Sequence, residues 1–122
     1  MKEQSVPLVS AQKQAQWFEQ IRKAHQSETA EDYVELINDL IASRGEARVV
    51  DLAERFGVSH ATVNKTIARL NREGLVVNRP YRSLFLTPAG EEMARRCKER
   101  HKVVLDFLIA LGVPEKIAEA DA

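Results

Sequence analysis

Apolar residues recur at helical spacing through most of the chain, which predicts a mainly α protein. Residues 29–44 carry one apolar stripe with i, i+3 and i+4 spacing, formed by Tyr33, Leu36, Ile37, Leu40 and Ile41. Gly45 then ends this first firm helix, in the role that glycine commonly has after helices. Residues 1–28 are polar and rich in Gln, so we expect a loose leader and then an accessory amphipathic helix around Trp17 and Ile21.

A short helix, a tight turn and a second helix follow over residues 49–72. Gly57 permits the positive φ that the turn needs. Ser59 is a favourable N-cap for the second helix, which is expected to run to about Arg72. The apolar positions that we expect to face the core are Val50, Leu52, Ala53, Val58, Val63, Ile67 and Leu70.

Two β-prone stretches, residues 75–78 and 83–87, flank the tip Arg79-Pro80-Tyr81-Arg82 and predict an exposed hairpin. Thr87 and Pro88 then suit the cap and first position of a long helix to Leu111, with a further helix from about residue 114. Two sides of the long helix are apolar, which is more than one small domain needs to cover. We therefore expect part of this surface to be a subunit interface.

The order helix, turn, helix, hairpin is typical of a winged helix-turn-helix, whose second helix fits the major groove of DNA. We expect an N-terminal extension over residues 1–28 and a winged helix-turn-helix DNA-binding domain over residues 29–87. Residues 88–122 are expected to form a helical dimerisation domain that is incomplete at its C-terminal end.

Composition limits the class of protein. The 122 residues are 44% hydrophobic, which is enough for one ordinary core, and no apolar run has the length of a membrane span. The N-terminus lacks the continuous apolar stretch of a signal peptide. A single cysteine, Cys97, excludes an internal disulfide framework and fits a reducing cytoplasm.

The formal net charge is zero, but the charge is unevenly distributed. Residues 58–87 hold five basic residues against one acidic residue, or +4, so the rest of the chain carries −4. Positive charge therefore gathers on the predicted second helix and hairpin. Because phosphate neutralisation dominates DNA affinity, we favour a DNA-facing patch over an ordinary solvated surface.

The outward face of the second helix supplies the candidate DNA contacts. Its N-terminal part lies deepest in the groove, where Asn64 suits adenine and Lys65 suits guanine or phosphate. Arg69 is expected on phosphate, and Arg79 and Arg82 on the backbone or minor groove. The predicted DNA-binding residues are Ser59, His60, Ala61, Thr62, Asn64, Lys65, Arg69, Arg79 and Arg82.

Asp32 and Glu35 lie three residues apart and so share a helix face, away from the apolar stripe. Two interpretations are open for these acids. They suit a metal site, and they also suit the first turn of a helix that begins near Thr29, where acids oppose the helix dipole. His101 lies on the apolar side of the long helix, where a lone histidine is usually a packed, hydrogen-bonded core residue.

Two segments resemble a known family. EDYVELINDLIASRGEARVVDLAERFGVSHATVNKTIARLNREGLV and YRSLFLTPAGEEMARRCKERHKVVLDFLIALGV resemble the manganese transport regulator branch of the diphtheria toxin repressor family, over about residues 30–122. The resemblance implies a dimeric winged-helix repressor that binds operator DNA when a divalent metal, Mn²⁺, is bound. Asp32 and Glu35 match the two carboxylate ligands of its E-D-Y-[VI]-E motif, and His101 matches the histidine ligand of its R-H motif.

The implied mechanism is a metal that bridges the helix of Asp32 and Glu35 to the helix of His101. This would orient two recognition helices for half-sites roughly 34 Å apart on the operator DNA. Oxygen and imidazole ligands suit Mn²⁺, and Fe²⁺ or Zn²⁺ can also use them. In the family, further ligands lie in an E-G-x-E-H-H motif just after the position of Asp121-Ala122, where this sequence stops. We therefore expect either a shortened chain or an incomplete site.

The sequence also allows two alternative functions. One is a winged-helix regulator controlled by another metal, a small molecule or redox chemistry at Cys97, although a lone cysteine on an apolar helix face is more often part of the core. The other is a protein interaction module that ignores DNA. The sequence has no nucleophile-base pairing, phosphate-binding loop or zinc-finger spacing, so an enzyme is not expected.

Overall fold

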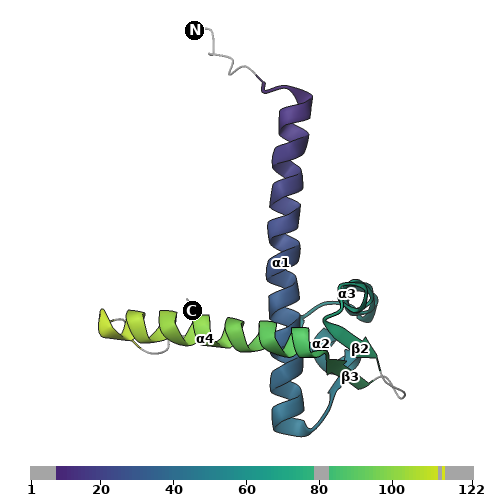
Figure 1. Cartoon of the computed structure of the whole chain (residues 1–122), viewed down its shortest axis with the longest axis vertical. Coiled ribbons are helices and arrows are strands. Elements are labelled where there is room, and N and C mark those ends of the chain that lie inside the picture. Colours follow the sequence, from purple (N-terminus) through teal and green to yellow (C-terminus); the bar gives the residue numbers. More distant parts are fainter. Residues whose placement is uncertain (1–7, 79–82, 113, 115–122) are drawn as a thin grey trace.

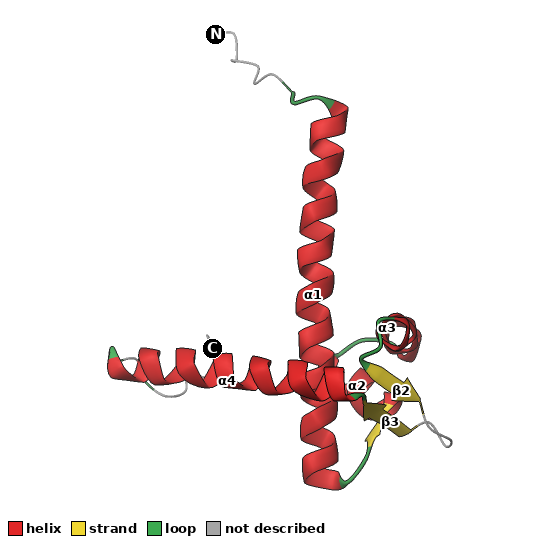
Figure 2. Ribbon diagram, viewed as in Figure 1, coloured by secondary structure: helices red, strands yellow, loops and turns green. Residues whose placement is uncertain are grey.

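The chain forms a small winged helix-turn-helix with two long helices that cross (Figure 1). The computed structural model describes residues 8–78, 83–112 and 114. In chain order, the elements of this part are α1 (Ala11–Arg44), β1 (Ala47–Arg48), α2 (Val49–Phe56), α3 (His60–Arg72), β2 (Val76–Asn78), β3 (Ser83–Leu86) and α4 (Pro88–Ala110). Figure 2 shows that the helices dominate and that the strands gather beside α2 and α3.

Helix α1 is one continuous rod of 34 residues, where the sequence had predicted two helices. No glycine or proline lies between its ends, so nothing in the chain breaks it near residue 28. Ser10 caps its start by accepting a hydrogen bond from the Lys13 amide at 3.2 Å, and Gly45 ends it with φ 81°. The predicted helix start near Thr29 is therefore wrong, and Asp32 lies inside a helix.

The N-terminal half of α1 extends away from the rest of the molecule (Figure 1). Its aromatic residues Trp17 and Phe18 contact each other, with ring centroids 5.7 Å apart, yet they are 59% and 47% exposed. Ile21 is also exposed. This segment therefore does not pack on the remainder of its own chain as an accessory helix would.

Helices α2 and α3 form the helix-turn-helix. Val49, Leu52, Ala53 and Phe56 give α2 its inward stripe, at i, i+3, i+4 and i+7. Val50 lies off this stripe and is exposed, as is Val58 after the turn, so the expectation that both fill the core was wrong. In α3, the predicted core positions Val63, Ile67 and Leu70 are buried.

The sheet is antiparallel with the strand order β1-β3-β2. Ala47 pairs with Leu84, and Val76 pairs with Leu86. The sequence predicted the β2 and β3 pair but not β1, whose two residues are too short to show a period. The predicted tip, residues 79–82, lies outside the described residues, as does the further helix expected after residue 114.

One apolar core joins α1, the helix-turn-helix, the sheet and the start of α4. Its largest fully buried side chains include Ile37, Leu52, Leu70 and Leu84, and the Tyr33 ring stacks on Phe56 with centroids 4.6 Å apart. Since α1 contributes to this core, it holds the acidic residues of the candidate metal site at a fixed position beside the helix-turn-helix. Within the described ranges, no helix combines the length and the apolar character that a membrane span needs.

Helix α4 crosses α1 and then continues beyond it (Figure 1). Thr87 caps α4 by accepting from the Gly90 amide at 3.1 Å, and Ala94 and Cys97 are buried against the rest of the chain. Further along α4, several apolar side chains are exposed to solvent. We call Val103, Val104, Phe107 and Leu111, which are 41–64% exposed, the α4 apolar face.

Candidate metal centre and nucleic-acid interface

The N-terminal turns of α3 present a polar and accessible surface. Ser59 is tied to Thr62, because its hydroxyl accepts from the Thr62 amide at 3.1 Å and donates to the Thr62 hydroxyl at 3.0 Å. This cap fixes the start of the helix and leaves its outer face open. The exposed predicted DNA-binding residues are Ser59, His60, Ala61, Thr62, Asn64 and Lys65.

Arg69 differs from these residues because it is half-buried and already has a protein partner. Its guanidinium donates to the Gln26 carbonyl of α1 at 3.2 Å, and so joins the far end of α3 to α1. Arg69 also lines an open groove of about 650 Å³ between α1 and α3, together with Lys65, Arg72 and Asp32. Arg79 and Arg82 lie outside the described residues.

Glu35 and His101 meet where α1 and α4 cross. Glu35 Oε2 lies 3.1 Å from His101 Nδ1, and Cys97 Sγ lies 3.8 Å from His101 Nε2. One potential ligand atom from each of Glu35, Cys97 and His101 lies within 4.8 Å of the others. Two of the three predicted metal ligands therefore come together, and a thiol joins them.

One oxygen of the Glu35 carboxylate lacks a hydrogen-bond partner among the described residues, and a cation would satisfy it. Glu35 Oε2 is buried and has no hydrogen-bond partner among the described residues, since its close approach to His101 lacks hydrogen-bond geometry. An anionic oxygen without partners is costly to remove from water. A bound metal ion would satisfy this oxygen, so the residues present fit a divalent cation.

Two ion pairs flank this cluster and fix the crossing of the helices. On one side Arg100 donates to Glu31 at 2.7 Å, and on the other Lys98 pairs with Asp39. The Arg100 and Lys98 pKa values are raised by these hydrogen bonds. Exposed pairs contribute little stability individually, but they place Glu35 opposite His101 between them.

Asp32, the third predicted ligand, lies outside the close cluster. Its carboxyl group is at the edge of a shallow cavity of about 270 Å³ that Glu35, Asp39 and Arg55 also line. Partial burial raises the pKa of Asp32, and the Glu35 carboxylate raises it further. Asp32 is thus close enough to respond to the charge of the cluster, and it also faces the groove beside α3.

Cys97 was not predicted as a site residue. It lies one helical turn before His101, and this i, i+4 spacing on α4 is the signal that the sequence offered. Burial raises the pKa of the Cys97 thiol to about 11, and the negative charge of Glu35 adds to the shift.

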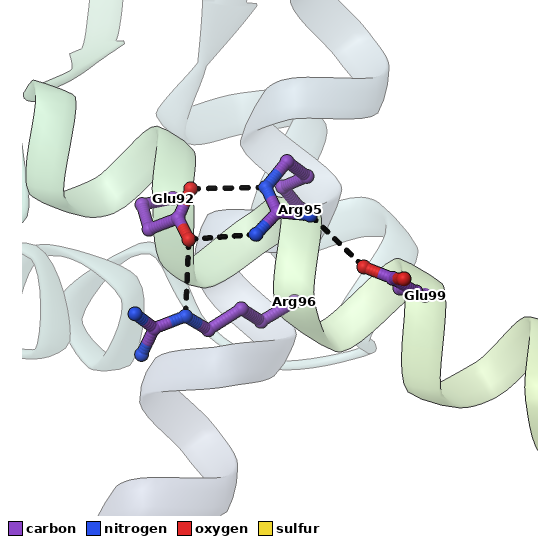
Figure 3. A network of polar contacts seen from close by, with 4 residues as sticks. All are labelled: Glu92, Arg95, Arg96 and Glu99. Carbon is purple, nitrogen blue, oxygen red and sulfur yellow. Dashed lines mark hydrogen bonds and ion pairs between the residues drawn. The ribbon is translucent and has the colours of Figure 1, made fainter.

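A separate network lies on the outer surface of α4 (Figure 3). Glu92 accepts hydrogen bonds from Arg95 at 2.7 Å and from Arg96 at 3.1 Å, and Arg95 also reaches Glu99 at 2.9 Å. The hydrogen bond from Arg95 is the main reason why the pKa of Glu92 falls to about 2. These residues stiffen the first turns of α4 and are distinct from the metal cluster.

Comparison with known proteins identifies the family. A family model described as "Iron dependent repressor, N-terminal DNA binding domain" matches residues 25–84. The transcriptional regulator MntR of Salmonella typhimurium is 49% identical over 115 residues, which cover 94% of this chain and 73% of that protein. The chain belongs to the MntR family.

More distant MntR relatives and solved structures agree with this assignment. The HTH-type transcriptional regulator MntR of Lysinibacillus sphaericus is 42% identical over 86 residues, covering 70% of this chain and 62% of the relative. A solved manganese-dependent transcriptional repressor in complex with manganese has a TM-score of 0.67 and 30% identity. It aligns with 75% of this chain, which spans only 42% of that solved chain.

Proposed function

We propose that this chain is a manganese-responsive, sequence-specific transcriptional repressor that controls genes of metal-ion homeostasis or transport. The MntR family and the likeness to a manganese-dependent repressor support this. The observation that carries the proposal is the contact between Glu35 on α1 and His101 on α4, 3.1 Å apart. A repressor acts on the chromosome, so we place it in the cytoplasm and assign it no enzymatic activity.

Asp32, Glu35 and His101 are the proposed metal ligands. Carboxylate oxygens and an imidazole nitrogen suit Mn²⁺, although Fe²⁺ or Zn²⁺ can use the same set. A bound cation would satisfy the buried Glu35 oxygen, which has no hydrogen-bond partner among the described residues. Glu35 then holds α1 to His101 of α4, and this fixes the direction in which α4 leaves the DNA-binding domain.

The same acids explain how a cation can favour DNA binding. Glu31, Asp32 and Glu35 lie on α1. Asp32 lines a groove that Lys65 and Arg69 of α3 also line. Negative charge beside a DNA-facing surface repels phosphate and weakens binding. Partial neutralisation of these carboxylates would therefore strengthen the attraction of α3 for DNA.

We assign reading of the DNA to the exposed start of α3. His60, Ala61, Thr62 and Asn64 are accessible for contacts in the major groove, with Ser59 at the cap. Lys65 is accessible for a guanine or a phosphate. Arg69 is a phosphate contact that also steadies α3 against α1. Arg79 and Arg82 are proposed wing contacts to the backbone or minor groove.

We also propose that the protein acts as a homodimer through the α4 apolar face. Single apolar side chains are normal on a protein surface, but Val103, Val104 and Phe107 lie together near the end of α4, and Leu111 is its C-cap. They continue into an open apolar groove of about 850 Å³ along α4, lined by Leu75 and Met93 among others. A second copy of this chain would cover this face and pair two reading helices on one operator.

A binding assay with native full-length protein tests the proposal. Duplexes selected in vitro from a random pool in the presence of Mn²⁺ supply an operator, and fluorescence anisotropy measures its affinity with and without Mn²⁺. We expect Mn²⁺ to strengthen binding by about tenfold or more, within the range of typical coupling free energies. Equal affinity in both conditions would reject metal gating.

Variants separate the metal response from DNA contact. His101→Ala should lose the response to Mn²⁺ and keep the weak metal-free affinity. Lys65→Ala should lower affinity in both conditions and reduce the salt dependence of binding. Gln20→Ala is the control, because Gln20 lies on the same helix as Glu35, is exposed and uncharged, and belongs to the extended part of α1. A Mn²⁺ response that survives in His101→Ala would contradict the assigned site.

A further inference from the structure

Cys97 is buried among the core residues, and its thiol also belongs to the candidate metal cluster. Cys97 is 1% exposed. Among the described residues it is nevertheless absent from the contiguous apolar cluster that includes its neighbour Ala94. Its sulfur lies 3.8 Å from His101 Nε2, and Glu35 supplies the third potential ligand atom within 4.8 Å. The Arg100 guanidinium is a further polar neighbour of the thiol. A buried sulfur between a carboxylate and an imidazole has the surroundings of a ligand.

We propose that Cys97 is itself a metal ligand, so that a thiolate sulfur joins the Glu35 carboxylate and the His101 imidazole around the ion. This inference rests on the metal site of the proposed function and adds a soft ligand to it. The added ligand makes the site a tight receptor for thiophilic divalent ions such as Zn²⁺ and Co²⁺, which would compete with Mn²⁺.

The separation of the three donors suits a single ion. An ion at the centre of a triangle with sides of 4.8 Å lies about 2.8 Å from each corner. Typical bonds from Zn²⁺ are about 2.3 Å to sulfur and about 2.0–2.1 Å to nitrogen or oxygen. Each donor therefore has to move inward by roughly half an ångström or somewhat more.

The two helices bring the three donor side chains together. Cys97 and His101 are one turn apart on α4 and face α1 together, while Glu35 approaches from α1. The flanking pairs of Glu31 with Arg100 and Asp39 with Lys98 hold the two helices together on both sides. The protein thus presents sulfur, nitrogen and oxygen to one point before any ion arrives.

Binding through sulfur changes the selectivity of the site. The S–H bond of Cys97 breaks, its proton passes to solvent and its electron pair forms the bond to the metal, with no change of oxidation state. Thiolate is a soft ligand that strengthens binding of Zn²⁺ and Co²⁺ more than binding of Mn²⁺, which prefers oxygen. Cys97 should therefore widen the difference in affinity between Zn²⁺ and Mn²⁺.

Cobalt absorption on the native full-length protein tests the ligand directly. Co²⁺ bound by a thiolate gives a sulfur-to-metal charge-transfer band in the near ultraviolet, whereas oxygen and nitrogen ligands alone do not. We expect this band in the wild type and its loss in Cys97→Ser. Zn²⁺ affinity should fall by about tenfold or more in that variant, and Mn²⁺ affinity by less than about threefold. Co²⁺ binding without the band, or equal losses for both metals, would overturn the proposal.

A measurement on the wild type alone covers the case in which Cys97→Ser does not fold. X-ray absorption of the protein loaded with one Zn²⁺ per chain should show a sulfur neighbour at about 2.3 Å. A first shell of nitrogen and oxygen only would overturn the assignment of Cys97.

The inference and the proposed function can fail separately. A Mn²⁺ response in DNA binding without any sulfur signal would remove Cys97 from the site and leave the manganese-responsive repressor intact. A sulfur signal without any effect of Mn²⁺ on DNA affinity would keep Cys97 as a ligand and reject metal gating.

Discussion

Glu35 Oε2 and His101 Nδ1 lie 3.1 Å apart, although one residue belongs to the first helix of the DNA-binding domain and the other to the helix that leads out of it. The contact brings a buried carboxylate oxygen with no hydrogen-bond partner in the described part of the chain to a half-buried imidazole. Such an arrangement is poor as a purely structural interaction. A cation bound at the proposed site would satisfy both groups.

The first prediction concerns the stability of Glu35→Gln. In metal-free protein, the neutral amide removes the charge of a partly buried carboxylate oxygen without a hydrogen-bond partner among the described residues, so the free energy of unfolding should stay equal or rise by up to about 1 kcal/mol. Saturating Mn²⁺ should raise the melting temperature of the wild type, since a ligand that binds only the folded state stabilises it. The variant should show little of this rise.

Glu54→Gln is the control for that measurement, because Glu54 is an exposed acid on α2 away from the cluster. It should respond to Mn²⁺ as the wild type does. An equal Mn²⁺ shift in Glu35→Gln would show that Glu35 does not hold the metal.

The second prediction uses the close approach of α4 to the backbone of Leu75, the residue just before β2. A Cβ added to Gly90 would lie 2.1 Å from the Leu75 carbonyl oxygen, which also accepts from the Thr87 amide at 3.1 Å. Gly90→Ala should therefore lower the free energy of unfolding by about 1–3 kcal/mol, as overpacking does. Urea denaturation measures this change.

The sign of the change in the free energy of unfolding of Gly90→Ala shows whether the contact with Leu75 obstructs the added Cβ. An alanine at an unobstructed helical position would instead stabilise the protein by up to about 1 kcal/mol. Gly45→Ala is the comparison, because no atom lies within 4 Å of its added Cβ and only its positive φ of 81° opposes the substitution. Gly90→Ala as stable as the wild type would contradict the close contact with Leu75.

Most of the fold followed from residue spacing, and the exceptions have identifiable causes. The helix-turn-helix was predictable because Gly57, Ser59 and the buried residues of α3 each act locally. The length of α1 was misjudged, since a change from an apolar to a polar helix face resembles a boundary even where no residue breaks the helix. Val50 was misplaced because an eight-residue helix holds too little of the period to fix its inward face.

The candidate site was only partly predictable for a different reason. Asp32 and Glu35 share a helix, so spacing suggested them, and the family resemblance added His101. Cys97 depends on how α4 crosses α1, which is a tertiary relationship that no local pattern contains. Its i, i+4 spacing to His101 had suggested only an apolar helix face.

The third prediction concerns the pKa of Glu92. Its pKa is about 2 in the folded protein because Arg95 and then Arg96 donate to its carboxylate, against an ordinary value of 4.5. NMR titration of the carboxyl carbon should give this low midpoint in the wild type. In Arg95→Ala the midpoint should move upward towards 4.5, while the Arg22→Ala control should leave it unchanged. A wild-type midpoint at 4.5 would reject the network of Figure 3 in solution.

The direction of the accompanying stability change follows from the lowered pKa. A carboxyl group with a depressed folded pKa contributes stability that is present above its unfolded pKa of 4.5 and is lost as the pH falls towards 2. Glu92→Gln should therefore be less stable than the wild type at pH 6, and the difference should shrink near pH 2. Because the network is exposed, high salt should also reduce the difference.

The last prediction tests the proposed role of the α4 apolar face in dimerisation. Phe107 is 61% exposed in the single chain, so Phe107→Asp should leave the folding of that chain intact while placing a charge in the proposed interface. Sedimentation of the native full-length protein should show a dimer for the wild type and a monomer, or a dimer weakened by about tenfold or more, for the variant. Asp106→Ala, at the exposed neighbouring position, should remain a dimer.

Because the binding of two α3 helices to one operator depends on the paired chains, Phe107→Asp should also lose affinity for a duplex with two half-sites. Its affinity for a single half-site should stay as before. Unchanged sedimentation and unchanged operator affinity in Phe107→Asp would place the subunit contact elsewhere on the chain.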